Sequence, residues 1–400
     1  MSDAYASYRK RSCGLKLNGH YLGKLEKLGK TFRFSYSDEW LNSGFSLCRS
    51  MPLTQKVFES EKLPSIFLDA SPDAWGKRIL QKAEFLSAML AKRNPVTLDD
   101  FDIFFRADDA TRMGAIQLTG FDTTEVLSFR TYEDGISDID RQVKLCYNFE
   151  NISDLNKNAK IIVDIMRRGV SSGGARPKFN VRIAEELWLC KCGSSEDMFH
   201  EPGWEAVNLS LAKLIGLNVP EFHYDPSLNL LYIKRFDRKG EKRIHYASAR
   251  TLLDADEGSY IEIATLCEKK SRIEIFKRMV FNALVGNYDD HLRNHGFLFD
   301  GEKWQLSPLF DVQCILIEKE ASFHATILPD GNAFSNVRSL LSHPASFGLS
   351  DDEAEKVLID MHRIVHKNVQ QFAEQYGLTE EFQLLKSCYS KLDEDILDYV

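Results

Sequence analysis

Three polar side chains in the C-terminal half of the chain have the types and spacing that phosphoryl transfer needs. Asp289 is followed five residues later by Asn294, and Asp311 comes seventeen residues after that, within GNYDDHLRNHGFLFDGEKWQLSPLFD. In kinases, an Asp on a catalytic loop accepts the proton of the attacking hydroxyl, while an Asn and a second Asp hold the magnesium ions that bridge the phosphates. The pattern therefore predicts a base and two metal ligands.

The same residues could instead form a solvated cap at the end of a helix, an alternative that the triplet alone leaves open. The elements expected around the loop favour a site. Residues 296–299 and 304–306 resemble short strands joined by an Asp-Gly turn, and this hairpin would carry Asp311 back toward Asn294. The helix before the loop is expected to end near Gly286 and to hold the loop rigidly.

A second candidate site lies in the glycine-rich segment GVSSGGARPKFNV, residues 169–181. Adjacent glycines leave backbone N–H groups open to surround an anion, and Lys178 would add a positive charge. The segment is not a Walker A loop, because Phe179 follows the lysine where Ser or Thr is required. A plain glycine turn is the alternative. Expected strands at 179–183 and 187–191 give the segment the hairpin setting of an ATP-binding lobe.

Residues beyond this hairpin complete the predicted nucleotide site. Lys191 at the strand end would reach the phosphates, although an exposed strand-terminal lysine is the common alternative. A helix expected from Pro202 carries Glu205 in its first turn, where it would either fix the lysine, as in kinases, or complement the helix dipole. A strand from residue 230 runs into Lys234, Arg235 and Phe236, which would suit a hinge whose backbone meets an adenine.

Composition is that of a globular enzyme with more than one unit. Four hundred residues exceed the roughly 250 to 300 that one hydrophobic core organises. A net charge of −8 gives no support to nucleic acid as the main partner. The N-terminus lacks the apolar core of a signal peptide and no window approaches the ~18 apolar residues of a membrane span, so we expect a cytosolic chain. Its eight cysteines are interpreted as reduced packing residues, with Cys190 and Cys192 on opposite faces of a strand.

The first part of the chain is expected to be a separate, strand-rich unit. Two strands flank the Asn18-Gly19 turn, and residues 31–36 alternate as a half-buried strand would. The sequence Ser71-Pro72-Asp73 then supplies the start signals of a helix, and a second helix is expected near Thr97. A polar stretch around residue 125 marks the approximate boundary.

Four segments, SSGGARPK, LYIKRFDR, GNYDDHLRNHGF and LSPLFDV, occur in this order and together resemble the HipA family of bacterial serine/threonine kinases, the toxins of type II toxin-antitoxin pairs. The early segments LDASPDAWGKRIL and RMGAIQL resemble the N-terminal domain of full-length members. The resemblance implies an α/β fold: a two-lobed protein-kinase-like core with an extra strand-rich N-terminal domain and a mostly helical C-lobe. The expected domains are 1–125, 126–235 and 236–400.

The resemblance also implies roles for individual residues. Asp289 would be the base, with His291 supporting the loop and contacting the nucleotide, and Asn294 and Asp311 would hold Mg²⁺. Lys191 would contact the phosphates of ATP. Ser171 occupies the autophosphorylation position of the family, with Ser172 as the alternative. The hinge that meets the adenine would comprise Lys234, Arg235 and Phe236. The glycine loop over the phosphates would comprise Gly173, Gly174, Ala175, Arg176, Pro177 and Lys178. Pro177 departs from the family pattern because it lacks a backbone N–H.

By resemblance, the protein would be an ATP- and magnesium-dependent serine/threonine protein kinase in the bacterial cytoplasm. A HipB-like antitoxin would bind it and give it contact with DNA only indirectly, and some relatives phosphorylate aminoacyl-tRNA synthetases. Two alternatives stay open. One is a kinase-shaped binding protein without chemistry. The other is a serine hydrolase built on the G-x-S-x-G sequence at 169–173 with His324, although a nucleophile elbow needs a strand before the serine, and a helix is expected there.

Overall fold

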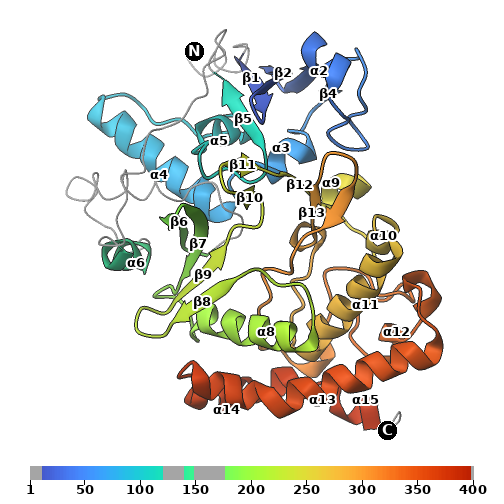
Figure 1. The fold of residues 1–400 in the computed structure, drawn as a ribbon. Helices are drawn as coiled ribbons and strands as arrows, with labels where there is room; N and C mark the ends of the chain where they lie inside the picture. Colours follow the sequence, from blue (N-terminus) through green and yellow to red (C-terminus); the bar gives the residue numbers. More distant parts are fainter. Residues whose placement is uncertain (1–10, 120–138, 148–175, 398–400) are drawn as a thin grey trace. The chain divides into compact units, whose positions relative to one another are not determined.

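The computed structural model describes residues 11–119, 139–147 and 176–397 (Figure 1). The chain divides into two compact units. We call Met1–Ser195 with Asp237–Ala247 the N-terminal unit, and Glu196–Phe236 with Ser248–Val400 the C-terminal unit. The chain thus leaves the C-terminal unit after Phe236 and returns to it at Ser248. The domain boundaries predicted at residues 125 and 235 stay predictions.

A five-stranded antiparallel sheet organises the N-terminal unit, with strand order β4-β3-β2-β1-β5. The turn between β1 and β2 is the predicted Asn18-Gly19 pair, and both residues have positive φ angles, 49° and 89°. This hairpin prediction is confirmed, since only such a pair fits a two-residue turn of this hand. The strands are β1 (Arg11–Leu17), β2 (His20–Leu28), β3 (Thr31–Tyr36), β4 (Phe58–Ser60) and β5 (Ile116–Thr119).

Helices of the N-terminal unit begin close to the predicted signals. Helix α4 (Ala74–Leu90) starts directly after Ser71-Pro72-Asp73 and buries Trp75 and Ile79. The second helix begins later than predicted, at Asp100, because Asp99 and Asp102 form a capping box that fixes its first turn. This second helix is α5 (Asp100–Arg106), and the other described helices of the unit are α2 (Asp38–Ser43), α3 (Ser65–Asp69) and α6 (Ile139–Tyr147).

A second hairpin of this unit follows the glycine-rich segment. Strands β6 (Lys178–Ile183) and β7 (Glu186–Cys192) pair antiparallel around Ala184 and Glu185, which both have positive φ angles. The predicted hairpin is confirmed. The placement of Cys190 and Cys192 on opposite faces is wrong, because residues two apart in a strand point to the same face. Both thiols are buried, and burial raises the pKa of each well above its ordinary value.

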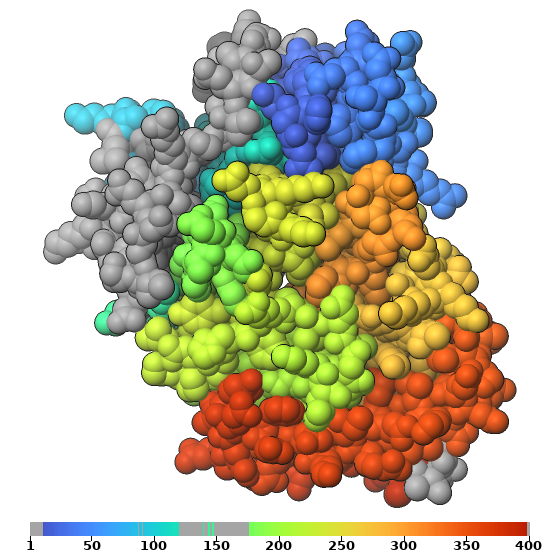
Figure 2. All heavy atoms as spheres, in the orientation of Figure 1, coloured from blue at the N-terminus to red at the C-terminus, as the bar shows by residue number. Residues whose placement is uncertain are grey.

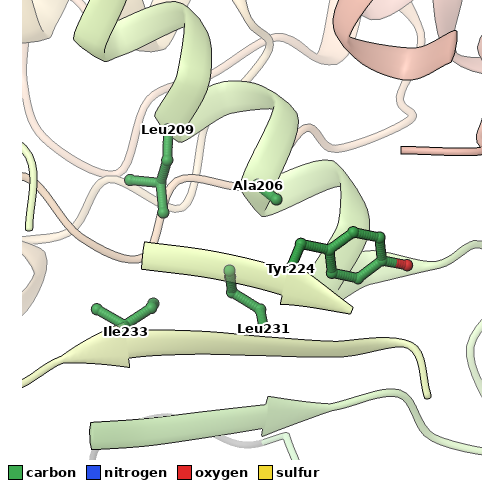
Figure 3. Close-up of a cluster of buried hydrophobic side chains, with 5 residues drawn as sticks. All are labelled: Ala206, Leu209, Tyr224, Leu231 and Ile233. Atoms are coloured by element: carbon green, nitrogen blue, oxygen red, sulfur yellow. The ribbon is translucent and has the colours of Figure 1, made fainter. Parts of the chain in front are cut away.

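In the C-terminal unit, helix α8 (Glu201–Ile215) packs on the hairpin of β8 (Phe222–Asp225) and β9 (Leu230–Lys234). Figure 3 shows the apolar side chains between them: Ala206 and Leu209 point from the helix toward Tyr224, Leu231 and Ile233 of the strands. The predicted helix around Pro202 is confirmed, with Pro202 in the first turn, where its missing N–H costs nothing. This core fixes the helix that carries Glu205.

The remainder of the C-terminal unit is mostly helical. The longest helix, α13 (Asp351–Gln375), packs on α8 and α11, and the predicted capping box of Ser350 and Glu353 opens it. The hairpin of β13 (Gly296–Phe299) and β14 (Trp304–Leu306) has the predicted bounds. The other helices are α9 (Ala249–Leu253), α10 (Tyr260–Thr265), α11 (Lys269–Leu284), α12 (Val337–Leu340), α14 (Thr379–Leu385) and α15 (Asp393–Leu397).

Three short strands lie where the chain passes between the units: β10 (Arg238–Lys239), β11 (Lys242–Arg243) and β12 (His245–Ser248). Strands β10 and β11 pair with each other within the N-terminal unit. Among the helices that the structure describes, none is both long and apolar enough to cross a membrane.

Candidate active site

The candidate catalytic loop begins where α11 ends. Gly286 follows the helix with a φ angle of 66°, a conformation that L side chains rarely adopt. A Cβ atom at this position would also lie 3.1 Å from the carbonyl oxygen of Cys388. Both the φ angle and the close approach of Cys388 therefore require glycine at the start of the loop. The predicted helix end near this residue is confirmed.

The two neighbouring aspartates of the loop have opposite environments. Asp289 is exposed, whereas Asp290 is 1% exposed. The Oδ1 atom of Asp290 accepts hydrogen bonds from the backbone N–H groups of Ala325 (2.8 Å) and Thr326 (3.2 Å). Its Oδ2 atom accepts from the Tyr260 hydroxyl and from Nδ1 of His324, the latter at 2.8 Å. Asp290 is thus a buried anchor.

The charge of this anchor is set by its partners. Burial by itself would raise the pKa of Asp290, but the neighbouring His324 and the hydrogen bonds from His324 and Tyr260 hold that pKa below its ordinary value. Asp290 is therefore ionised at neutral pH. Its carboxylate accepts from His324, so the Nδ1 atom of that histidine carries the proton.

A chain of buried hydrogen bonds extends from the anchor to both ends of the loop. Asn287 donates to Asn282 (3.0 Å), and Asn282 donates to the Tyr260 hydroxyl (2.9 Å), which in turn donates to Asp290. Nε2 of His295 lies 3.0 Å from the carbonyl oxygen of Asp290. Because these groups are buried and each bond orients the next group, the network holds the loop in one conformation.

Asp289 lies among the other predicted catalytic residues. Its carbonyl oxygen accepts a hydrogen bond of 2.8 Å from Nδ2 of Asn294, which ends the short 3₁₀ turn Leu292–Asn294. Partial removal from water raises the pKa of Asp289, the negative charges of Asp311 and Asp290 raise it further, and His291 opposes them. The structure therefore brings Asp289, His291, Asn294 and Asp311 together. A raised pKa suits a group that must accept a proton.

His291 has an unsatisfied nitrogen beside this cluster. Its Nδ1 atom is buried, and no group among the described residues is hydrogen-bonded to it. Buried polar atoms in native proteins nearly always have a partner. The role predicted for His291, support of the loop and contact with the nucleotide, stays a prediction, and a bound ligand or water would satisfy the nitrogen.

Asp311 is held in an unusual backbone conformation. Its φ angle is 59°, in the left-handed region that Asp and Asn tolerate better than most residues. The backbone N–H of Asp311 donates to Oε1 of Glu205 at 3.2 Å, and the Glu205 side chain is completely buried on α8. Glu205 therefore positions Asp311, a role that the sequence did not predict. The predicted ion pair of Glu205 with Lys191 stays a prediction.

The predicted hinge lies at the end of β9. Lys234 is the last residue of the strand, and its Nζ atom donates to Glu221 at 3.2 Å. The Phe236 ring contacts that of Phe310, the residue before Asp311, with ring centroids 5.5 Å apart. Arg235 between them is buried. The role of these residues as an adenine hinge stays a prediction, and the structure places it next to the metal-ligand candidate Asp311.

In the N-terminal unit, the two predicted phosphate-binding lysines lie directly opposite each other. Lys178 is the first residue of β6 and pairs in register with Lys191 of β7, and the side chains are 2% and 8% exposed. The backbone carbonyl of Lys178 accepts from Trp75 Nε1 at 3.0 Å. Residues directly opposite each other in an antiparallel pair point to the same face, so the two cationic side chains lie on one face of the hairpin, an arrangement that suits phosphate groups.

Most of the glycine loop is not among the described residues. Ser171, Ser172, Gly173, Gly174 and Ala175 fall outside them, and only Arg176, Pro177 and Lys178 remain. The carbonyl oxygen of Pro177 accepts from the N–H of Cys192 at 3.0 Å, so the backbone pairing of the hairpin continues one residue beyond β6. Pro177 thus continues the hairpin.

The segment after the hinge is tied to the N-terminal sheet within its own unit. Asp237 is completely buried and accepts from the N–H of Gly114 at 2.7 Å, while Arg243 donates to the carbonyl oxygens of Gly114 (2.9 Å) and Asp109 (2.8 Å). The early RMGAIQL segment and the later KRFDR segment are therefore in contact. This explains why residues 237–247 belong to the N-terminal unit.

Comparison with known families agrees with this arrangement. The model of the HipA-like C-terminal domain matches residues 170–369, which is half of the chain, and that of the HipA N-terminal domain matches residues 15–122. The chain belongs to the HipA family. All four segments on which the predicted resemblance rests fall within the first of these matches, and the two early segments fall within the second.

Individual relatives support the fold. HipA of Shewanella oneidensis MR-1, solved in complex with HipB and operator DNA, has a TM-score of 0.64 at 17% identity and is matched over 97% of both chains. Y4dM of Sinorhizobium fredii is 27% identical over 150 residues, which are 31% of this chain and 36% of the relative. The chain thus matches about a third of the length of that relative.

The fold prediction is confirmed. The protein is α/β, with a strand-rich N-terminal region, a kinase-like core and a mostly helical C-terminal part, and the HipA structure covers nearly all of it. The proinflammatory kinase CtkA of Helicobacter pylori has a TM-score of 0.35 at 15% identity over 56% of this chain and 94% of its own. That score is too low to add to the assignment.

Proposed function

We propose that this HipA family member is an ATP- and magnesium-dependent serine/threonine protein kinase. The observation that carries the proposal is the pair Asp289 and Asp290. Asp290 is locked in a buried network, and this network presents Asp289 to solvent beside Asn294 and Asp311. The relative Y4dM of Sinorhizobium fredii is itself named as a kinase, which also supports the proposal.

The residues present fit the proposed cofactors. Magnesium prefers oxygen ligands, and the amide oxygen of Asn294 and the carboxylate of Asp311 supply them. The buried lysines 178 and 191 suit the phosphates of ATP. Magnesium would neutralise charge that develops on the transferred phosphoryl group. Asp289 would orient the hydroxyl of a serine or threonine and accept its proton, which its raised pKa favours.

For the biological role, we infer a toxin that a HipB-like antitoxin restrains, with contact to DNA only through that antitoxin. Membership of the family and the HipA, HipB and operator DNA complex from Shewanella support this inference. The proposed substrate is an aminoacyl-tRNA synthetase, whose phosphorylation would halt translation.

Regulation is proposed to occur at Ser171, with Ser172 as the alternative. A phosphoserine in the glycine loop would bring about −1.5 to −2 charges to a segment built to receive the phosphates of ATP. Mass spectrometry after incubation with ATP and magnesium should find the phosphate on one of these serines, and the modified protein should bind ATP more weakly. Unchanged ATP affinity in the modified protein would contradict the regulation.

The two alternatives make different demands. A serine hydrolase would need an accessible imidazole, but the Nε2 atom of His324 is buried without a partner in the described part of the chain, and its Nδ1 atom is bound to Asp290. This geometry speaks against hydrolysis.

A kinase-shaped binding protein would bind ATP without transferring phosphate.

Transfer of radioactive phosphate from ATP to the protein and to a bacterial extract tests the proposal. Asp289→Asn should lower transfer by about 10² to 10⁴-fold while ATP binding persists. Asp352→Asn, at an exposed aspartate in the first turn of α13, is the matched control and should leave transfer unchanged. Near-normal transfer by Asp289→Asn would overturn the assignment of the base. ATP binding by the wild type without any transfer would favour the binding-protein alternative.

A further inference from the structure

A cluster of two histidines and one aspartate lies near the C-terminus, away from the residues assigned above. His362 and His366 are four residues apart on α13, so they share one face of the helix. The Nε2 atoms of both point to the same Oδ1 atom of Asp393, at 2.9 and 2.8 Å, and Asp393 opens α15. The two imidazole rings are 4.2 Å apart.

This arrangement has the composition of a transition-metal site. Zinc binds imidazole nitrogen and carboxylate oxygen at about 2.0 to 2.2 Å, and tetrahedral geometry then places ligand atoms about 3.3 Å apart. The three candidate ligand atoms already lie within 4.8 Å of one another, and two of the separations are a few tenths of an ångström below the ideal value. Small rotations of the side chains would open room for an ion.

Exposure and charge around the cluster also favour a cation. The side chains of His362, His366 and Asp393 are 22%, 34% and 37% exposed, which leaves a fourth position open to water. Two cationic side chains beside the cluster are engaged by other carboxylates. Lys319 pairs with Glu394 and Asp395 next to the cluster, and Arg363 pairs with Asp360.

We propose that His362, His366 and Asp393 bind one divalent ion of the zinc class, with one Nε2 atom from each histidine, one aspartate oxygen and a water molecule. Figures 1 and 2 show the C-terminal helices, in orange to red, at the surface of their unit. The partial exposure of the three side chains gives an ion access from solvent. Two histidines at this spacing on a helix are a common zinc-binding pair, and Asp393 adds the third ligand that a catalytic or exchangeable site has.

The consequence of binding would be a fixed C-terminal segment. This segment, which runs from the 3₁₀ turn Lys386–Tyr389 to α15, lies against the start of the catalytic loop. Cys388 packs on Gly286, and the Nζ atom of Lys391 lies 4.8 Å from the centre of the Tyr288 ring, which precedes Asp289. An ion at Asp393 would therefore join α13 to the segment that supports the loop.

Zinc chloride titration of the full chain, first stripped with a chelator, tests the site by calorimetry and by thermal unfolding. At a zinc concentration 100 times the Kd, the unfolding midpoint should rise by about 5 °C or more. Replacing any one of the three ligands, as in His366→Ala, should weaken this binding event by more than about 10-fold. Magnesium chloride should give no such rise, because a hard ion disfavours imidazole.

The control is His20→Ala. His20 lies 3.4 Å from Glu39 as an exposed histidine–carboxylate pair, and it belongs to no metal-type cluster among the described residues, so this variant should bind zinc like the wild type. Hydrogen exchange should report slower exchange of residues 386–397 in the zinc form. Cysteines and the proposed catalytic aspartates also bind metals. Only the bound zinc that the substitutions of His362, His366 or Asp393 abolish is therefore assigned to this site.

The proposal is overturned if His362→Ala, His366→Ala and Asp393→Asn all keep the wild-type zinc stoichiometry and affinity. Cobalt(II) gives a second measurement that does not depend on stability. Its visible absorption should show a tetrahedral site in the wild type and in His20→Ala, and the band should be absent from His366→Ala. An identical cobalt spectrum in wild type and His366→Ala would also overturn the proposal.

Discussion

Replacing Asp290 with asparagine is expected to destabilise the C-terminal unit, whereas the same change at Asp289 is not. The carboxylate of Asp290 accepts four hydrogen bonds in a buried site. An asparagine would keep its oxygen toward the N–H groups of Ala325 and Thr326, since backbone donors cannot turn. Its NH₂ group would then face the two donors on Tyr260 and His324.

The expected magnitude follows from these partners. The Tyr260 hydroxyl can rotate and accept, but His324 can accept at Nδ1 only if its proton moves to Nε2, which is buried and has no partner among the described residues. Hydrogen bonds to a charged group contribute about 1.5 to 3 kcal/mol each. Loss of one or two gives about 1.5 to 6 kcal/mol, a range that includes the 3 to 5 kcal/mol for breaking a buried ion pair.

Thermal and guanidinium unfolding of both variants at pH 7 check this estimate. For a unit of roughly 200 residues, a loss of about 3 kcal/mol lowers the unfolding midpoint by about 6 to 12 °C. Asp289→Asn should stay within about 0.5 kcal/mol of the wild type, because its side chain is exposed. Equal midpoints for Asp290→Asn and the wild type would refute the network as the anchor of the loop.

Three further outcomes are expected. Burial lowers the pKa of His295 to about 4, so the folded state keeps it neutral while the unfolded state binds a proton below pH 6.5; its contribution to stability is complete above pH 6.5 and is lost as the pH falls toward 4. The free energy of unfolding should therefore be about 2 kcal/mol lower at pH 5 than at pH 7 on account of this residue. In His295→Gln, the free energy of unfolding should change less between these two pH values. Asp311→Asn, which tolerates the φ angle of 59°, should weaken magnesium-dependent ATP binding and turnover together; an unchanged magnesium titration would place Asp311 outside the site. Gly286→Ala should lower the unfolding midpoint by more than Gly377→Ala, because the φ angles are similar, 66° and 75°, but only the first Cβ meets a neighbour, at 3.1 Å; equal losses would contradict the close approach.

Several local features were predictable because neighbouring residues determine them. The Asn18-Gly19 turn, the hairpin of β6 and β7 and the capping box of Ser350 and Glu353 follow from the conformational preferences of adjacent residues. The Asp289, Asn294 and Asp311 spacing was informative for the same reason. One loop and one short hairpin bring these three residues together, so spacing along the chain corresponds to proximity in space.

The error at Cys190 and Cys192 has a different origin. Strand geometry alone places residues two apart on one face, so the correct answer was available from the sequence. The late start of the helix at Asp100 shows how a boundary depends on side-chain detail, because the capping box of Asp99 and Asp102 competes with the earlier signal near Thr97.

The sequence by itself determined the family, several hairpins and helix starts, and the residues that could carry the chemistry, because motifs and turn signals are local. Only the tertiary structure decided which of two adjacent aspartates is buried. The partners of Asp290 lie 30 residues before it and 34 to 36 residues after it. The bond from Asp311 to Glu205 spans 106 residues. Hydrogen bonds between residues so far apart form only when packing of the apolar core brings their elements together, and no local pattern encodes them.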